Sequence, residues 1–311
     1  MPMPKTAPSA LETVFEAADR VILGKGHEIR LAICCLLAGG HLLIEDLPGV
    51  GKTTLAQLLA RLLGLDYSRI QFTSDLLPAD IIGVSVYERS VETFRFHPGP
   101  IFAQVVLADE INRATPKAQS ALLEAMEERQ VTVEGATREL PRPFFVIATQ
   151  NPHHQIGTFP LPESQLDRFL MLLRLGYPAA AQERELLAGE DRRALLSRVQ
   201  PHLSPQALIV LQAQVNAVHL SAPIVAYCHD ILVFTRRSSR FAYGLSPRAG
   251  LGLLRAARAW ALLAGRDYCL PEDVQVVLPA CLPHRLTDSG DGAGEVHEDI
   301  ADYILAGVPV A

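Results

Sequence analysis

Several features that would point to other classes of protein are missing from this sequence. None of its apolar runs is long enough to cross a bilayer, so we expect no membrane span. Residues 1–10 are rich in proline and lack the apolar core of a signal peptide, so we expect a cytoplasmic protein. Basic residues are not in excess, since the sequence has 28 Lys and Arg residues and 34 Asp and Glu residues, which gives a net charge of -6. This balance disfavours a general nucleic-acid or anionic-membrane binder, and we expect no nucleic-acid partner.

Cysteine is scarce, and its spacing does not indicate a metal site. The cysteines number five, which is odd, and they are Cys34, Cys35, Cys228, Cys269 and Cys281. All of them lie among apolar residues, so we expect buried thiols rather than metal ligands or disulfides. Internal repeats and low-complexity tracts are missing as well. The pair His153-His154 follows a predicted strand, and we interpret it as part of a polar loop rather than as a metal site.

What the sequence does contain indicates two domains. Close to half of the 311 residues are hydrophobic and a fifth are charged, which is a globular composition, and the length exceeds what one core usually serves. Strands alternate with helices up to Gly176-Tyr177-Pro178, and only helices are expected beyond that point. The pattern therefore predicts an α/β core with a parallel sheet at residues 1–177, followed by an all-helical lid at residues 178–311.

Hydrophobic periodicity places the individual elements. We expect buried or half-buried strands at residues 67–73, 101–108, 144–149 and 171–175, and hairpins that pair 83–87 with 93–97 and 130–133 with 137–140. Helices are expected at residues 11–20, 28–38, 54–63, 115–128 and 251–263. Further helices should begin where a capping residue precedes proline, at Ser204-Pro205 and Ser246-Pro247 and, similarly, at Ala222-Pro223. Residues 289–294 should form a flexible loop.

The rest of the chain is organised around residues 42–63. A short apolar strand leads into the sequence Glu45-Asp46-Leu47-Pro48-Gly49-Val50-Gly51-Lys52-Thr53-Thr54, and an apolar helix follows. Gly49 and Gly51 let the backbone curl so that successive N–H groups point at a phosphate, and the positive end of the helix adds to that field. Lys52 can reach the outer phosphates, and Thr53 can hold a magnesium ion. This is the pattern of a P-loop, except that Asp46 stands where the first glycine usually does.

An acidic pair follows a second buried strand. The sequence Val105-Val106-Leu107-Ala108-Asp109-Glu110 places Asp109 beside the magnesium water shell and Glu110 where it can polarise an attacking water. Strands often end in acidic residues, so the pair alone is a weak signal. With a P-loop upstream at domain-scale separation, it predicts a nucleotide-hydrolysing site.

Three polar residues further along could complete such a site. Asn151 ends the strand at 144–149 and could hold the attacking water or sense the γ-phosphate, although Asn-Pro by itself is only a turn. Arg168 could be an arginine finger for a neighbouring subunit or could simply pair with Asp167. Arg248 lies in the first turn of a helix, where a cation is disfavoured unless a phosphate binds, and the alternative is a solvated arginine.

Together, these motifs resemble an AAA+ ATPase, and within that superfamily a MoxR-type ATPase. The matching segments are residues 45–53, 108–114, 148–152, 161–169 and 245–249, and the acidic Asp46 fits the MoxR pattern. The resemblance implies bound ATP and Mg²⁺, with Thr53 and Asp109 toward the metal. It also implies these nucleotide-binding residues: Gly24, Pro48, Gly49, Val50, Gly51, Lys52, Thr53, Thr54 and Asp109. The implied catalytic residues are Glu110, Asn151 (sensor 1), Arg168 (arginine finger) and Arg248 (sensor 2).

The resemblance further implies how such a protein works. Residues 84–96 would be the helix-2 insert and residues 130–140 the pre-sensor hairpin. MoxR-type proteins typically form hexameric rings and act as chaperone-like remodellers, often of partners with von Willebrand factor A domains. The main hypothesis is therefore a Mg-ATP hydrolase that remodels or matures a protein client.

Two alternatives remain open at this point. One is a nucleotide-dependent switch or scaffold with little turnover, and the other is the motor subunit of a metal chelatase. Glu110 and Arg168 favour hydrolysis. Because the local motifs hold no second cation beside Lys52 to meet γ-phosphate charge, we expect Arg168 to act on a neighbouring subunit.

Overall fold

The computed structural model describes residues 7–90, 92–151, 158–287 and 298–310. Within them, one parallel sheet has the strand order β2-β5-β8-β1-β9. Its strands are β1 (Leu42–Glu45), β2 (Tyr67–Gln71), β5 (Val105–Asp109), β8 (Phe145–Gln150) and β9 (Met171–Leu173). The three central strands are buried along their whole length, as expected for a sheet covered on both faces. The first strand lies between the last two, so the strand order reverses beside β1, where such sheets bind ligands at the carboxyl ends of their strands.

Two hydrophobic clusters cover the two faces of the sheet. Side chains alternate along each strand, so Leu42 and Ile44 join one cluster while Leu43 joins the other. The first cluster contains the apolar faces of α1 (Ala7–Val21), α2 (Gly26–Leu37) and α3 (Lys52–Leu62). The second contains those of α4 (Pro78–Ile82) and α5 (Pro116–Glu128). The core is thus an αβα sandwich, as the sequence predicts.

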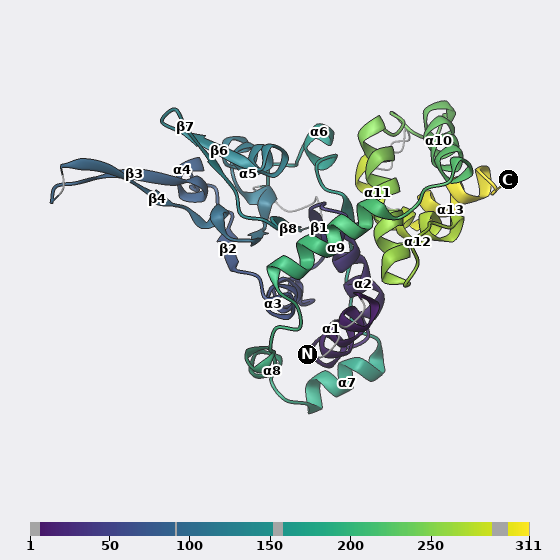
Figure 1. Ribbon diagram of the computed structural model, residues 1–311, viewed down its shortest axis with the longest axis horizontal. Coiled ribbons are helices and arrows are strands. Elements are labelled where there is room, and N and C mark those ends of the chain that lie inside the picture. The colour runs from purple at the N-terminus through teal and green to yellow at the C-terminus, as the bar shows by residue number, and fades with distance from the viewer. Residues whose placement is uncertain (1–6, 91, 152–157, 288–297, 311) are drawn as a thin grey trace.

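The remaining chain is helical, and its core is continuous with that of the sheet. The short helix α6 (Glu163–Leu166) precedes β9 and belongs to the α/β core. The helices after β9 are α7 (Ala180–Ala188), α8 (Arg192–Arg198), α9 (Pro205–Ala217), α10 (Ala222–Arg237), α11 (Pro247–Leu263), α12 (Pro271–Cys281) and α13 (Glu298–Gly307). Figure 1 shows α10 to α13 gathered at one end, whereas α7 and α8 lie beside α1. The first hydrophobic cluster runs from α1–α3 into α9–α12, across the predicted boundary at 177/178. None of the helices in the described residues is long and apolar enough to cross a membrane.

Two antiparallel hairpins interrupt the α/β pattern at the predicted places. One pairs β3 (Gly83–Glu88) with β4 (Thr93–Pro98), and it reaches well away from the sheet (Figure 1). The other pairs β6 (Gln130–Val133) with β7 (Ala136–Glu139) through a two-residue turn. Both turn residues, Glu134 and Gly135, have positive φ, which matches the twist of a tight hairpin.

Some predicted boundaries and caps differ from the structure. The strand expected at 101–108 starts only at Val105, because Pro100–Phe102 form a 3-10 turn. The helix expected at 54–63 begins at Lys52. Ser204 and Ser246 cap their helices through side-chain hydrogen bonds, as expected. The helix expected at 115–128 begins at Pro116, and Thr115 occupies its cap position without such a bond. All five cysteines are buried and unpaired, as predicted. The His153-His154 pair and the loop at 289–294 lie outside the described residues.

Candidate active site

The loop between β1 and α3 has the backbone conformation of a phosphate cradle. Gly49 and Gly51 adopt left-handed φ values of 90° and 99°, and Gly51 is the residue that caps α3. A Cβ atom added at either glycine would meet no atom within 4 Å, so the glycines are needed for their backbone conformation rather than for space. The N–H groups of the first turn of α3 remain available for an anion beside Lys52, Thr53 and Thr54.

Lys52 is the buried cation of this loop. Only 8% of the residue is exposed, and its Nζ donates hydrogen bonds to the backbone oxygen of Asp46 at 2.5 Å and to Oδ1 of Asn151 at 3.3 Å. Burial lowers the pKa of Lys52, while the negative charges of Asp46 and Asp109 oppose that shift. The lysine is therefore held at the mouth of the loop, in contact with Asn151, the residue that follows β8.

Asp109 is buried at the end of β5, and the neighbouring strand fixes its orientation. The Thr149 hydroxyl in β8 donates to Oδ1 of Asp109 at 2.6 Å. The same hydroxyl accepts the backbone N–H of Glu110 at 2.8 Å. This follows from the parallel register, which sets Ala108 beside Ala148 and so brings the next residues of the two strands together. Thr149 was not singled out from the sequence, because only the register shows its contact with the acidic pair.

Glu110 and Asn151 contact each other at the same edge of the sheet. Asn151 is 4% exposed, and its Nδ2 donates to Oε1 of Glu110 at 3.2 Å while its Oδ1 accepts from Lys52. Glu110 has a left-handed φ of 56°, a costly conformation for a residue with a Cβ atom, which is typical of functional sites. The structure thus joins Lys52 at the start of α3, Asn151 after β8 and Glu110 after β5 in one chain of hydrogen bonds.

Cations that the sequence analysis missed also contact the acidic pair. Arg69 of β2 binds Oδ2 of Asp109 with Nη2 at 2.6 Å, and Arg113 binds Oε2 of Glu110 at 2.8 Å. Gln71 donates to the same Glu110 oxygen at 3.0 Å. The expectation that the local motifs hold no second cation beside Lys52 is therefore wrong for Arg113, which lies within the segment 108–114 and binds Glu110. No local motif marks Arg69, since it reaches Asp109 only because β2 pairs with β5.

The acidic residues at the start of the P-loop have structural partners. Asp46 accepts the backbone N–H of Gly176 at 2.6 Å and that of Leu47 at 2.8 Å. Glu45 is buried and pairs with Arg174 at 2.5 Å. Asp46 therefore ties the loop to the segment between β9 and α7 instead of leaving a negative charge aimed at a phosphate.

Gly24, in the turn between α1 and α2, has a φ of 70°. A Cβ atom there would come within 3.0 Å of Gln182.

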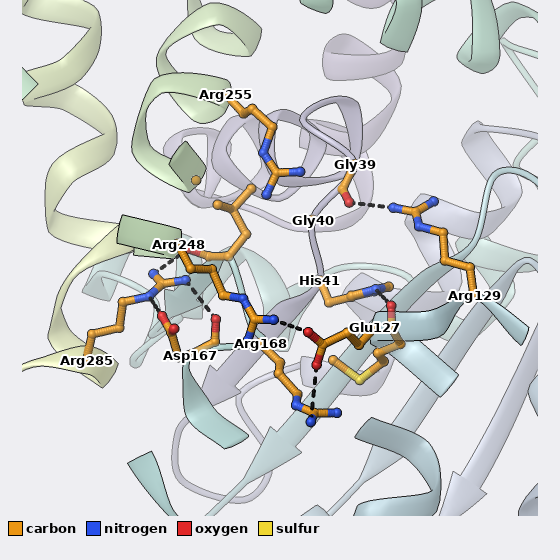
Figure 2. Close-up of a pocket in the computed structure, with 13 residues that line it drawn as sticks. Gly39, Gly40, His41, Glu127, Arg129, Asp167, Arg168, Arg248, Arg255 and Arg285 are labelled. Atoms are coloured by element: carbon orange, nitrogen blue, oxygen red, sulfur yellow. Dashed lines mark hydrogen bonds and ion pairs between the residues drawn. The ribbon is translucent and has the colours of Figure 1, made fainter. Parts of the chain in front are cut away.

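Arg168 and Arg248 lie together in a separate pocket. Figure 2 shows both side chains converging on Glu127 of α5. Nη2 of Arg168 is 3.1 Å from Oε2 of Glu127, and its Nη1 donates to the backbone oxygen of Leu123 at 2.6 Å. Arg248 forms an ion pair with the other oxygen of Glu127. Within the described residues, neither arginine forms a hydrogen bond or ion pair with the P-loop or the acidic pair.

The structure agrees with neither of the alternative interpretations of these arginines, a pair with Asp167 for Arg168 and a solvated side chain for Arg248. Arg168 does not pair with Asp167, whose carboxylate instead accepts from Arg285 at 2.7 Å and from the Ser246 hydroxyl at 3.1 Å. Arg248 is 46% exposed by its side chain, but it is held by Glu127 rather than merely solvated.

Comparison with known proteins agrees with this geometry. Residues 41–171 match the family model "ATPase family associated with various cellular activities (AAA)", and residues 233–303 match an AAA lid domain. The chain is 48% identical over 276 residues to the uncharacterized protein YeaC of Bacillus subtilis, covering 89% of this chain and 86% of that protein. It is 42% identical over 302 residues to the chaperone MoxR1 of Mycobacterium tuberculosis, covering 93% and 79% of the two chains.

The three-dimensional likeness extends over the core and the helical part. The crystal structure of a presumed ATPase from Cytophaga hutchinsonii superimposes with a TM-score of 0.88 at 36% identity, covering 98% of this chain and 96% of that one. The likeness therefore includes the sheet, the P-loop and the helices beyond residue 178. On these grounds, the chain belongs to the MoxR-type AAA+ ATPases.

Proposed function

We propose that this chain binds Mg-ATP at its P-loop and hydrolyses it. The observation that carries the proposal is the hydrogen-bonded link from Lys52 through Asn151 to Glu110, beside the buried Asp109. One edge of the sheet thus gathers three groups. They are a cation that can bind phosphates (Lys52), a carboxylate that can face a metal ion (Asp109) and a carboxylate that can polarise water (Glu110). A phosphate-binding scaffold without turnover would need only the first of these groups.

The donor set fits a nucleotide and a hard cation. Left-handed glycines shape the loop, Thr53 and Asp109 offer oxygen ligands, and Lys52 offers charge to the outer phosphates. When bound, Mg²⁺ supplies positive charge that neutralises the phosphate oxygens. Glu110 accepts a proton from the attacking water. Asn151 positions Glu110 and Lys52 through its hydrogen bonds to both side chains. Thr149 keeps Asp109 and the backbone at Glu110 in place.

Arg168 and Arg248 are proposed to serve a neighbouring copy of the chain. Both are anchored on Glu127, in a pocket whose lining includes none of the P-loop residues. Arginines held together and away from their own nucleotide cradle are suited to reach a phosphate presented by another subunit. The sequence leaves open whether Arg248 acts within its own subunit or across the interface. The anchor on Glu127 that it shares with Arg168 supports action across the interface.

The assembly is proposed to be a ring, a hexamer, that remodels or matures a protein client. Its support is membership of the family and the relative that is named as a chaperone. The β3–β4 hairpin is the candidate client contact, because it extends from the core and carries exposed apolar side chains. A client with a von Willebrand factor A domain belongs to the same proposal.

Two substitutions test the chemistry. Glu110→Gln should bind ATP like the wild type but lose turnover, since it keeps the shape of the side chain and loses the carboxylate. Lys52→Ala should lose ATP affinity, since it removes the charge that meets the phosphates. Glu128→Gln, an exposed glutamate at the end of α5, is the matched control and should keep full activity. The measurements are ATP affinity by titration and phosphate release at saturating ATP. Wild-type turnover by Glu110→Gln would rule out its role.

A further inference from the structure

The pocket that holds Arg168 and Arg248 contains more positive charge than those two residues provide. Its lining includes five arginines but only two carboxylates, from Glu127 and Asp167, which leaves an excess of three positive charges in a chain that is acidic as a whole. The arginines are Arg129, Arg168, Arg248, Arg255 and Arg285. His41 also lines the pocket, but burial lowers its pKa to about 3 and it stays neutral.

Of the five arginines that line the pocket, Arg255 is the one without a hydrogen-bond or ion-pair partner among the described residues. It lies seven residues after Arg248 on α11, so both side chains share one face of that helix. Figure 2 shows its guanidinium directed toward the pocket from the side opposite Glu127. Partial removal from water lowers the pKa of Arg255, and the positive charges of Arg285 and Arg248 lower it further, although the residue as a whole is exposed.

The other arginines are already committed to groups of the protein. Glu127 serves two of them, Asp167 serves Arg285, and Arg129 donates to the backbone oxygen of Gly39 at 2.8 Å. Positive charges gathered in this way repel each other, and a multiply charged anion would remove that repulsion. Planar guanidinium groups also bind phosphate oxygens in pairs.

The size of the pocket limits the ligand. Its volume of about 190 Å³ is below the roughly 300–1,000 Å³ of pockets that enclose whole small molecules. It therefore suits a compact group rather than a nucleoside. A single carboxylate would offset only one of the three excess charges, whereas an oligophosphate carries several charges in a small volume.

We propose that this pocket binds the phosphoryl end of an oligophosphate, with Arg255 as a third arginine beside Arg168 and Arg248. The oligophosphate has two possible sources: the nucleotide of a neighbouring copy, which rests on the function proposed above, or a free inorganic oligophosphate. In both cases, Arg255 contacts the phosphate oxygens from α11 while Glu127 holds the other two arginines in position.

A binding experiment tests the pocket without the P-loop. Inorganic tripolyphosphate is titrated calorimetrically into the Lys52→Ala variant, alone and combined with Arg255→Met, Arg255→Lys or Arg193→Met. Arg193 is an exposed arginine of α8 outside the pocket and serves as the matched control. For a free source, we expect Arg255→Met to weaken binding about 10-fold or more, Arg255→Lys to weaken it less, and Arg193→Met to leave it unchanged.

An activity experiment identifies the other source. If the phosphate comes from a neighbour, Arg255→Met lowers the ATPase rate at saturating ATP, and mixing it with Lys52→Ala subunits, which still carry Arg255, restores part of that rate. Arg193→Met keeps the wild-type rate. Circular dichroism and thermal melting verify that each variant is folded, and Arg255→Lys replaces Arg255→Met in both experiments if the latter does not fold.

The outcomes separate this inference from the proposed function. Arg255 variants that match Arg193→Met in both tripolyphosphate binding and ATPase rate overturn the inference, even if Arg168→Ala is inactive. A fully active Arg168→Ala variant overturns the action of the arginines across an interface. In that case, tripolyphosphate binding that depends on Arg255 would still support the pocket as a site for a free anion.

Discussion

Asp46 replaces the first glycine that a P-loop usually has, and its contacts explain why an acidic residue is tolerated there. Its two carboxylate oxygens accept the N–H groups of Leu47 and Gly176, so the charge is used within the protein. Gly176 has a left-handed φ of 61° and precedes the first helix of the helical part. Asp46 thus connects the start of the nucleotide loop with the segment that leads toward the lid.

Removing this carboxylate should affect both stability and nucleotide binding. Asp46→Ala leaves two N–H groups without their acceptor, and we expect the free energy of unfolding to fall by about 1–3 kcal/mol. ATP affinity should fall as well, because the backbone oxygen that positions Lys52 belongs to the same residue. Urea unfolding and ATP titration measure the two effects. Asp46→Asn, which keeps one acceptor oxygen, should give intermediate values, and an Asp46→Ala protein with unchanged stability would contradict this role.

Among the secondary-structure elements, the β3–β4 hairpin is exceptional because it exposes apolar side chains on a projecting ribbon. Phe94 is 70% exposed and Tyr87 is 49% exposed, and the centroids of their rings lie 5.3 Å apart. Phe96 anchors the hairpin near its base, because its ring centroid lies 5.9 Å from that of Phe102 and its ring lies beneath the guanidinium of Arg138. Such exposed apolar groups are typical of surfaces that bind other proteins.

Shortening the hairpin should leave the fold and basal activity intact. Replacing residues 87–94 by Asn-Gly keeps the pair Val86 and Arg95 and the anchored base. We expect soluble protein, a basal ATPase rate within about twofold of wild type, and weaker binding of a dye that reports exposed apolar surface. The double variant Tyr87→Ser and Phe94→Ser keeps the ribbon and should show the same loss of dye binding. Insoluble protein after the shortening would indicate that the ribbon belongs to the folded core.

At the scale of the whole molecule, the candidate site is divided between two places. The P-loop, Asp109, Glu110 and Asn151 lie at one edge of the sheet, whereas Arg168 and Arg248 are anchored on α5 in another pocket. We propose that Arg168 and Arg248 complete the site of a neighbouring copy. Activity should therefore depend on contact between copies of the chain.

Arg168 should act on the site of a neighbouring copy. Arg168→Ala should bind ATP but lose roughly 10³–10⁵ of the hydrolysis rate, because the charge that meets the transferring phosphoryl group is removed. The ATPase rate per wild-type subunit should rise with protein concentration and then level off. Mixing Arg168→Ala with Lys52→Ala should restore part of the activity, since each variant supplies the group that the other lacks. A constant rate per subunit at all concentrations, with Arg168→Ala fully active, would exclude this arrangement.

The sequence by itself determined the α/β core, the helical part, both hairpins and the order of the main motifs. These features depend on short-range patterns: the alternation of apolar residues, a Gly-rich loop before a helix, and an acidic pair after a buried strand. Asn151 was also predictable, because parallel strands end at the same edge of a sheet. Each of these inferences needs only residues that are close together in the chain or the general topology of such folds.

Only the tertiary structure decided how the site is held together. Thr149 reaches Asp109 and Arg69 reaches the same carboxylate across about 40 residues of sequence, because the register of β2, β5 and β8 sets them side by side. Glu127 gathers Arg168 and Arg248 from distant segments in the same way. Such contacts have no local signature, since they arise when packing of the apolar core brings remote polar groups together, and a sequence pattern does not record that packing.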